Sequence, residues 1–348
     1  MPTTVDYDAL EKVHCDFLDL TALEADVRAL VNELAQPIDD AIASAARDRG
    51  IDEAYFVAVG GSYGALGYAQ YLLQRKSKRP ALLMNANEFL VKRPPGLGAR
   101  SLVVLASHSG NTPEVVAAAV LARAHGAFVV TVGGSTTGKF HASADYPCVA
   151  EVRSASVAAH VQGMLIAVAY LRHVEGDEAA AAAVLADLRA LPEFLETTRD
   201  ASVALARTAA SRFAKVDHLY VAGHGTLAAF AYQLAIIGLH EFARVTATPL
   251  DLGDFFHGPL EAMEPGQHLL LFHDVNEESR TLSERVERFC EQVGVDTVVA
   301  DARRIAPDAS EFLSFFTLFR FARHFTSYMG LIRDHNPDDK RYMGVIEY

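Results

Sequence analysis

Two short stretches decide the fold of this 348-residue chain. Residues 56–62 read Phe-Val-Ala-Val-Gly-Gly-Ser, and residues 220–226 read Tyr-Val-Ala-Gly-His-Gly-Thr. Each is an apolar run that ends in glycine and a small hydroxyl residue, and a segment rich in Ala and Leu follows it. This pattern is typical of a buried strand that turns sharply into a helix, which is the first step of a βαβ unit.

The two stretches align at an offset of 164 residues without a gap. The match continues past the glycines, pairing Ala65 with Ala229 and Tyr68 with Tyr232. Further apolar strand candidates match at nearby offsets. Self-similarity of this length predicts an internal duplication, and a chance likeness between two α/β domains is the alternative.

The first half contains more strand candidates, separated by helical patterns. They are residues 81–84, 101–106, 127–132 and 146–149. Short apolar strands that alternate with helices predict a mainly parallel sheet. We therefore expect an α/β protein with two tandem, doubly wound parallel-sheet domains.

We predict four segments along the chain. Residues 1–50 form an N-terminal helical arm, helical from about residue 7 to 48. Residues 51–195 form the first domain and residues 196–330 the second. Residues 331–348 form a C-terminal tail, which we expect to lie over the active site.

Composition excludes several classes of function. The net charge is −13, with 44 acidic and 31 basic residues, so we expect no nucleic-acid partner. No apolar run has the roughly 18–20 residues of a membrane helix, because His160 and Gln162 interrupt the longest candidate, and no signal peptide is visible. Three scattered cysteines without a CxxC indicate a reducing compartment. We predict a cytoplasmic protein that binds no membrane.

Residues 107–114 read Ser-His-Ser-Gly-Asn-Thr-Pro-Glu and form the clearest binding motif. Ser107, Ser109 and Thr112 offer three hydroxyl groups, and Gly110 lets an anion approach the backbone closely. The Pro-Glu pair opens a helix, whose N-terminus attracts anions at the carboxyl end of a parallel strand. The alternative is that the hydroxyl groups only cap this helix.

The second half has lost this motif. Its residues 273–278 read His-Asp-Val-Asn-Glu-Glu, and carboxylates there would repel a phosphate. We therefore place the anion in the first half. The chain has no phosphate-binding GxxxxGK[ST] loop, and residues 60–62 lack the third glycine of a dinucleotide fingerprint, so a phosphosugar suits the site better than a nucleotide. No metal-ligand spacing occurs, and we expect no metal and no cofactor.

A second constellation consists of Glu241 and His257. Glu241 follows an apolar helical pattern at residues 228–239, which would place it in partly desolvated surroundings suited to a general base. His257 lies between two aromatic residues and a Gly-Pro pair, which would fix its loop. A base and an acid in separate environments are what aldose–ketose proton transfer requires. The alternatives are a solvated helical Glu and a packed loop His.

Taken together, these motifs resemble the sugar isomerase (SIS) superfamily, and the duplicated layout is similar to the isomerase portion of glucosamine-6-phosphate synthase. The end of the chain distinguishes between branches of this superfamily. Residues 334–342 read Asp-His-Asn-Pro-Asp-Asp-Lys-Arg-Tyr, and the chain closes in Glu-Tyr. This tail, together with residues 257–261 and 264–266, resembles the fructosamine-6-phosphate deglycases.

The resemblance implies a role for each matching residue. Glu241 would move the proton between C1 and C2, and His257 would assist ring opening, from the neighbouring subunit in some relatives. A homodimer or higher homo-oligomer is therefore expected. The sugar phosphate would be held by Ser62, Ser107, Ser109 and Thr112. Weaker candidates for substrate contact are Gly60, Gly61, His108, Ser154, Ser156, His335, Arg341 and Tyr348.

The implied activity converts a fructosamine 6-phosphate and water into glucose 6-phosphate and a free amine or amino acid. The chain has Gly-Leu-His before Glu241, where the synthase pattern has lysines, and this argues against the synthase reaction. Two alternatives remain open. One is a glucosamine-6-phosphate deaminase-type or other phosphosugar isomerase, and the other is a non-catalytic phosphosugar sensor. The sequence does not identify the amine.

Overall fold

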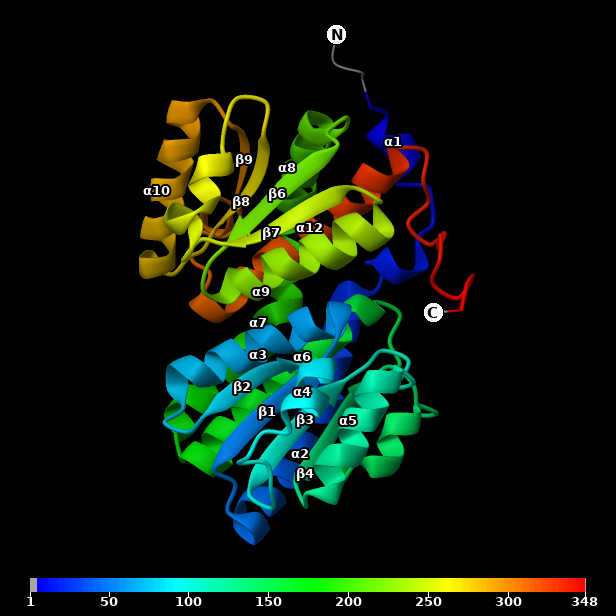
Figure 1. The fold of residues 1–348 in the computed structure, drawn as a ribbon, viewed down its shortest axis with the longest axis vertical. Helices are drawn as coiled ribbons and strands as arrows, with labels where there is room; N and C mark the ends of the chain where they lie inside the picture. Colours follow the sequence, from blue (N-terminus) through cyan, green and yellow to red (C-terminus); the bar gives the residue numbers. More distant parts are fainter. Residues whose placement is uncertain (1–4, 348) are drawn as a thin grey trace. The chain divides into compact units, whose positions relative to one another are not determined.

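The computed structural model describes residues 5–347, which divide into two compact units. Unit 1 comprises residues 5–20 and 193–347, and unit 2 comprises residues 21–192. Each unit contains one parallel sheet with helices on both faces (Figure 1). The predicted α/β fold with two doubly wound domains is confirmed.

The sheet of unit 2 has the strand order β2-β1-β3-β4-β5, and all neighbours are parallel. Its strands are β1 (Glu53–Ala58), β2 (Ala81–Asn85), β3 (Ser101–Ala106), β4 (Phe128–Gly133) and β5 (Tyr146–Val149). Every strand predicted for the first domain is present, and the ends of β2 to β5 differ from the predicted ends by at most one residue.

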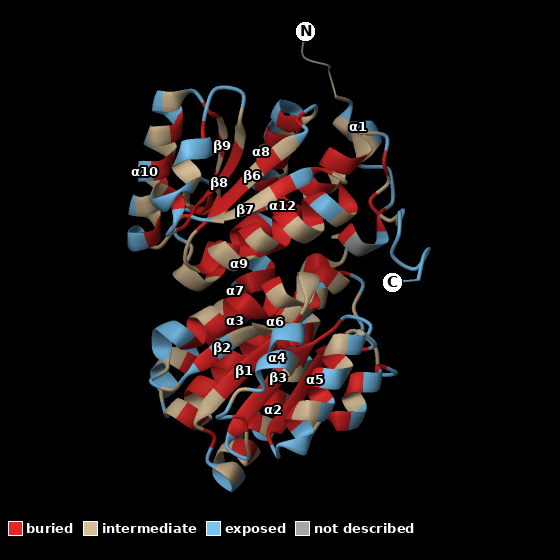
Figure 2. Ribbon diagram, viewed as in Figure 1, coloured by how far each residue is buried: buried red, intermediate tan, exposed pale blue. Residues whose placement is uncertain are grey.

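The strands of unit 2 are mostly apolar because helices cover both faces of the sheet. Tyr55 and Val57 pack with Phe89 and Val115 on the face covered by α4 (Ala86–Lys92) and α5 (Pro113–Ala124). The opposite face is covered by α2 (Leu23–Arg49), α3 (Gly60–Lys76) and α6 (Ala155–Tyr170), which pack on one another. Figure 2 shows the buried strands between helices whose outer sides are exposed.

The sheet of unit 1 has the order β7-β6-β8-β9. Its strands are β6 (His218–Gly223), β7 (Thr246–Asp251), β8 (His268–His273) and β9 (Asp296–Asp301). This order repeats β2-β1-β3-β4 of unit 2, which supports the predicted duplication. The sequence pattern did not predict β7, because Pro249 interrupts it. Proline is tolerated there since β7 is an edge strand.

Helices also cover both faces of the sheet of unit 1. One face carries α9 (Thr226–Gln233), its π-helical continuation η4 (Leu234–Phe242), α8 (Arg199–Phe213) and α12 (Glu311–Leu331). The other carries α10 (Glu277–Val293) and the short turns η5 (Phe255–His257) and η6 (Pro259–Ala262). The remaining described elements are α1 (Tyr7–Leu10), η1 (Asp16–Leu18), η2 (Lys139–Ser143), η3 (Leu171–Glu175), α7 (Glu178–Thr197) and α11 (Ala302–Ile305).

The prediction of a continuous helix over residues 7–48 is wrong between α1 and α2. The intervening chain is held by the C-terminal part of unit 1. The Tyr328 hydroxyl donates a hydrogen bond to the Glu11 carboxylate, and the Asp16 backbone N–H donates to Asp338 Oδ2 at 2.6 Å. These contacts outweigh local helix propensity, which is a weak preference in comparison.

The helix before Glu241 is longer than predicted, so Glu241 lies inside it and not after it. The helix continues through η4 to Phe242, with the i−5 bond from Ala243 N to Gly238 O at 3.0 Å. A Cβ added to Gly238 would lie 2.7 Å from Thr326 Oγ1, so η4 and α12 approach closely there. π-helical turns are rare and occur frequently at functional sites.

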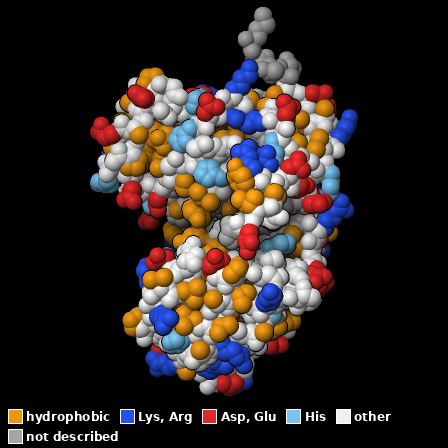
Figure 3. Space-filling model, turned by 45° about the vertical axis from the view of Figure 1, so that its right-hand side comes forward, with side chains coloured by type: hydrophobic (Ala, Val, Ile, Leu, Met, Phe, Trp, Pro, Cys, Tyr) orange, Lys and Arg blue, Asp and Glu red, His pale blue; other side chains and the backbone are white. Residues whose placement is uncertain are grey.

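One described stretch, Ala155–Glu175, is long and apolar enough to cross a membrane, but 78% of its most apolar window is buried inside the protein. It comprises α6 and η3, and α6 packs on α2 and α3 as a core helix does. Acidic side chains are scattered over the face of each unit seen in Figure 3, in line with the net charge of −13.

Candidate functional site

Unit 2 has a ligand-binding edge of the kind found in doubly wound folds. β1 and β3 are neighbours, while β2 lies on the other side of β1, so the strand order reverses between β1 and β3, and doubly wound folds bind their ligands beyond the carboxyl ends of such strands. Residues 60–62 begin α3 directly after β1, and residues 107–112 follow β3. The sequence-predicted phosphate residues Ser62, Ser107, Ser109 and Thr112 therefore all lie at this edge.

Hydrogen bonds within residues 107–112 shape this loop. Ser107 is 4% exposed, and its Oγ lies 2.9 Å from Thr112 Oγ1. The Gly110 N–H donates to Ser107 Oγ at 3.1 Å, and the Asn111 N–H donates to Ser109 Oγ at 3.2 Å. Ser107 and Thr112 thus tie the loop to the helix start, while Ser109 is exposed.

Gly110 is required by the conformation of this loop. Its φ is 67°, and an added Cβ would lie 2.6 Å from the Gly138 Cα and from the Phe140 ring. Thr112 is the N-cap residue of α5, yet its side chain makes no capping hydrogen bond. The capping alternative therefore does not explain Thr112, whose hydroxyl instead meets Ser107.

The weaker candidates of the first half lie at the same edge of the sheet. Gly60 and Gly61 start α3, and Gly60 has a φ of 57°. His108 is exposed and lies against Gly134, whose added Cβ would be 2.9 Å from His108 Nδ1.

Ser154 and Ser156, at the start of α6, are buried, with exposures of 0% and 7%. Neither hydroxyl has a hydrogen-bond partner among the described residues. Buried polar groups are normally paired, so these two hydroxyl groups are suited to contact a polar ligand.

The corresponding edge of unit 1 is filled by a carboxylate of the chain itself. Asp274 follows β8 as Ser107 follows β3, and it is 2% exposed. Thr226, the counterpart of Ser62, donates to Asp274 Oδ2 at 2.7 Å, and Ser314 donates to Oδ1 at 2.6 Å. This arrangement leaves no place for a second anion, which favours the first half as the anion site.

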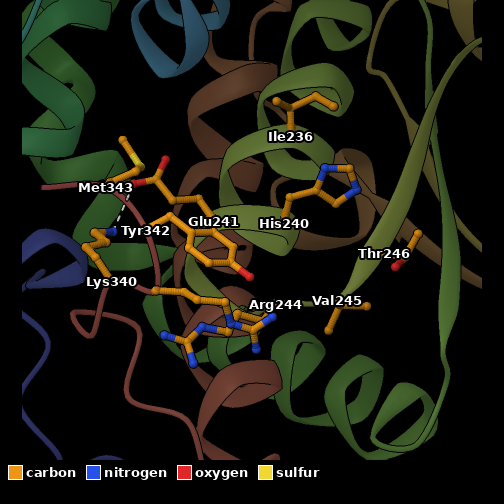
Figure 4. A pocket seen from close by; sticks show the side chains of 10 residues that line it. Ile236, His240, Glu241, Arg244, Val245, Thr246, Lys340, Tyr342 and Met343 are labelled. Carbon is orange, nitrogen blue, oxygen red and sulfur yellow. Dashed lines mark hydrogen bonds and ion pairs between the residues drawn. The ribbon is translucent and has the colours of Figure 1, made fainter. Parts of the chain in front are cut away.

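Glu241 lines a pocket of about 470 Å³ in unit 1, at the amino end of β7. The Lys340 ammonium donates to Glu241 Oε1 at 2.9 Å and lies 3.7 Å from the centroid of the Phe242 ring. The Glu241 side chain is 21% exposed. The pocket is shown in Figure 4 and is lined by Ile236, His240, Glu241, Arg244, Val245, Thr246, Lys340, Arg341, Tyr342 and Met343.

The turn between η4 and β7 is held by side chains that flank Glu241. The Ala247 N–H donates to His240 Nε2 at 2.8 Å. Arg244 has a φ of 52°, which is rare for a residue other than glycine, and its Nη2 donates to the Asp339 carbonyl at 2.8 Å.

The tail residues differ in their relation to this pocket. Arg341 lines it, together with Lys340 and Tyr342. His335 does not line it and is buried beside Phe242. Burial lowers the pKa of His335, and the nearby Arg244 guanidinium adds to the effect. Tyr348 lies outside the described residues.

His257 and Glu241 are not brought together within unit 1. Glu241 precedes the amino end of β7, whereas His257 is exposed on η5, beyond the carboxyl end of that strand. Successive turn bonds, from Asp254 N to Asp251 O and from His257 N to Asp254 O, keep η5 close to that end. The six residues of β7 span about 17 Å.

Two charged residues of the pocket were missed by the sequence analysis. Lys340 lies inside the tail motif at residues 334–342, but nothing in the sequence indicates that it pairs with Glu241. Arg244 carries no sequence signal, since its placement depends on its positive φ and on the Asp339 carbonyl.

The three cysteines are free and buried. Burial raises the pKa of Cys148 to about 12 and that of Cys290 to about 11, so neither is suited to act as a thiolate nucleophile. No group of three or more His, Cys, Asp or Glu within residues 5–347 is arranged to hold a metal ion.

Known proteins resemble this chain over nearly its whole length. The fructoselysine 6-phosphate deglycase of Escherichia coli is 29% identical over 346 residues, which cover 97% of this chain and 99% of that protein. The fructosamine deglycase of Bacillus subtilis is 29% identical over 307 residues, covering 86% of this chain and 93% of that protein. No model of a known protein family matches the chain.

The chain resembles the fructosamine deglycases. In fold it is a double-SIS protein: a crystal structure of a B. subtilis protein, described as a phosphosugar isomerase, superimposes with a TM-score of 0.81 and 26% identity. That alignment covers 94% of this chain and 100% of the other. Both the sequence comparison and the structure comparison therefore lead to proteins that are named for phosphosugar substrates.

The contact between the tail and η4 in this deglycase-like chain is testable by hydrogen exchange. Lys340→Met keeps an apolar stem but removes the ammonium that meets Glu241 and Phe242. A partly buried ion pair of this kind is worth about 0.5–1 kcal/mol, so amides in residues 336–347 should exchange roughly two- to fivefold faster.

The matched control is Lys92→Met, which breaks the exposed Lys92–Glu88 pair on α4. It should leave exchange in the tail unchanged. Equal protection of the tail in the wild type and in Lys340→Met would show that Lys340 does not hold it.

Proposed function

We propose that this chain is an enzyme that converts a fructosamine 6-phosphate and water into glucose 6-phosphate and a free amine or amino acid. The observation that carries the proposal is similarity to a fructoselysine 6-phosphate deglycase across 97% of the chain. The chemistry of the described residues agrees with it, because one loop suits a phosphate and a separate carboxylate suits a proton transfer.

The phosphate end of the substrate belongs at the β1/β3 edge of unit 2. Exposed Ser109 can donate to a phosphate oxygen, and the positive end of the α5 dipole attracts the anion. Gly110 allows the left-handed turn and the close packing on Gly138 and Phe140 that hold the loop carrying Ser109. Asp274 supports this choice by elimination, since its carboxylate fills the equivalent edge of unit 1.

The proton transfer belongs to Glu241. After ring opening, the carboxylate takes a proton from C1 of the ketosamine, and an enaminol forms. A proton is then delivered to C2, which gives an aldimine of glucose 6-phosphate. Water hydrolyses the aldimine and releases the amine. These steps need a positioned base and acid, each of which contributes typically 10²–10⁴-fold.

The loop of residues 107–112 lies in unit 2, and Glu241 lies in unit 1. The proposal therefore requires that one substrate contact the loop and Glu241, which belong either to one chain or to two chains. His257 adds a second requirement. In unit 1 it is separated from Glu241 by the length of β7, so we propose that it serves a site in another copy of the chain. A homodimer is the smallest assembly in which this is possible.

The base assignment predicts the behaviour of Glu241→Gln. This variant keeps the size of the side chain but cannot accept the C1 proton. Turnover of a fructosamine 6-phosphate should fall by roughly 10²–10⁴-fold while the substrate still binds. The wild type in deuterium oxide should place deuterium at C2 of glucose 6-phosphate. A folded Glu241→Gln that keeps more than about a tenth of wild-type turnover would rule out the base role.

The phosphate assignment predicts the behaviour of Ser109→Ala. Its hydroxyl is exposed, so the loop should keep its fold while KM rises by about tenfold with little change in kcat. Ser44→Ala, a half-buried serine on α2, is the control and should change neither constant. Equal turnover of phosphorylated and unphosphorylated ketosamines would contradict the assignment.

The assembly proposal predicts complementation between inactive variants. Glu241→Gln and His257→Ala homodimers should each be nearly inactive, but verified mixed dimers should recover part of the activity, because one site then holds both intact groups. Mixed dimers without any recovery would place both residues in a single chain's site. Measuring released amino acid against released ammonia in the same assays separates deglycase from deaminase activity.

A further inference from the structure

The turn after β6 presents His224 between two glycines that the backbone requires. A Cβ added to Gly223 would clash with the Leu227 carbonyl oxygen, and Gly225 has a φ of 60°. The aligned residue of unit 2 is Gly60, so unit 1 carries an imidazole where unit 2 has no side chain. Neither the phosphate site nor the transfer between C1 and C2 makes use of this imidazole.

Asp251 holds the His224 ring in one orientation. Nδ1 of the ring lies 2.9 Å from Asp251 Oδ1, and a carboxylate only accepts, so Nδ1 carries a proton and donates it. The Gly253 N–H donates to the same oxygen at 2.9 Å, which fixes the carboxylate at the end of β7. The His224 side chain is 36% exposed, and its Nε2 bonds to no residue within 5–347, so Nε2 can meet a ligand.

Two carboxylates, Asp251 and Asp274, act on this imidazole. The hydrogen bond to Asp251 raises the pKa of His224, burial opposes the effect, and the charge of Asp274 adds to it. The same hydrogen bond lowers the pKa of Asp251. Near neutral pH the ring therefore exists in both protonation states, which suits a residue that donates a proton and takes one back.

His257 lies on the segment that follows β7, at the same edge of the sheet. The Leu252 N–H donates to the Gly223 carbonyl at 3.1 Å, which joins this segment to the turn that carries His224. Turn bonds along residues 251–257 then keep η5 beside the end of β7. A substrate that His257 reaches from this edge therefore lies at the edge that presents His224.

We propose that His224, oriented by Asp251, is a further catalytic residue, which unit 1 supplies to the same active site as His257 for hydrolysis of the aldimine. The inference rests on the proposed function, in which Glu241 carries the transfer between C1 and C2. Hydrolysis is the step for which that function has no residue. Asp251 is a positioning residue, because it acts through the His224 ring.

Hydrolysis of the aldimine needs a group that gives and takes protons in turn. Water adds to C1, the electron pair of the C=N π bond moves to nitrogen, and protonated His224 gives this nitrogen a proton from Nε2. Neutral His224 takes a proton from the added oxygen, which leaves a carbinolamine. A second proton from His224 lets the C1–N bond break with its electron pair on the amine. His224 takes the hydroxyl proton as the C1=O bond forms, which restores the imidazolium.

The first test is the turnover of His224→Gln with the ketosamine 6-phosphates of glycine, lysine and 6-aminohexanoate. Loss of the proton donor should lower kcat by roughly tenfold or more, with little change in KM. His268→Gln is the matched control, because Nε2 of His268 lies 4.0 Å from Asp296 Oδ2 at the amino end of β8. It removes a histidine beside a carboxylate at the opposite end of the same sheet and should keep the wild-type kcat.

The pH profile of Asp251→Asn tests the positioning role. Without the Asp251 charge, the pKa of His224 falls, and less imidazolium is present at a given pH. Because the protonated ring is the donor, the alkaline decline of kcat should begin at a lower pH than in the wild type. An unchanged profile would overturn the role of the pair.

Mixed dimers show which site His224 serves. Dimers of His224→Gln with Glu241→Gln should recover activity wherever dimers of His257→Ala with Glu241→Gln do. Dimers of His224→Gln with His257→Ala should recover none, because each site then lacks one of the two histidines. Recovery in this last combination would show that the two histidines serve different sites, and it would overturn the proposal.

The outcomes separate this inference from the proposed function. If the wild type releases glucose 6-phosphate from none of the three conjugates, the proposed function itself fails. If the wild type is active and a folded His224→Gln keeps more than about half of its kcat, the role of His224 is overturned while the deglycase activity stands. If His224→Gln does not fold, as judged by circular dichroism, the pH profile of Asp251→Asn decides.

Discussion

Parallel strand pairing constrains everything else in this protein. In each sheet all strands run in one direction, so every strand-to-helix turn on the carboxyl side falls at the same edge. Two turns separated by about 45 residues of sequence, those after β1 and β3, therefore meet at the point where the strand order reverses. The glycine and hydroxyl residues of these turns are thereby brought to one edge of the sheet, where we propose that they bind the phosphate.

The loops after β3 in unit 2 and after β8 in unit 1 occupy corresponding positions but differ in charge. In unit 2 the loop after β3 ties its own hydroxyl groups together and leaves the edge open. In unit 1 the buried Asp274 carboxylate accepts from Thr226 and Ser314 and supplies the negative charge internally. A buried carboxylate needs such donors, because an unpaired one would be strongly destabilising. In unit 1 a side chain of the chain itself therefore lies at the edge that corresponds to the proposed phosphate site of unit 2.

Much of this could be predicted from the sequence. Apolar runs and glycine turns predicted the strands of unit 2 and the duplication, since these signals are local. β7 was missed because Pro249 hides an edge strand, and the break after α1 was missed because it depends on Glu11 and Tyr328, which are distant in sequence. The residues of the hydroxyl loop follow a contiguous motif. The Glu241 pocket joins η4 to a tail about 100 residues away, and no local pattern specifies that pairing.

The contacts around η4 give a physical reason for the position of Glu241. A π-helical segment carries one extra residue per turn compared with an α-helix, so it redirects the side chains that follow it. Close packing of Gly238 on α12 fixes η4, and the His240 bond to Ala247 fixes the turn into β7. Glu241 lies between these two fixed points, and the Lys340 ammonium of the tail donates a hydrogen bond to its carboxylate. Lys340 reaches the glutamate from a tail about 100 residues away in sequence, while His240, the neighbour of Glu241, is used for the bond to Ala247.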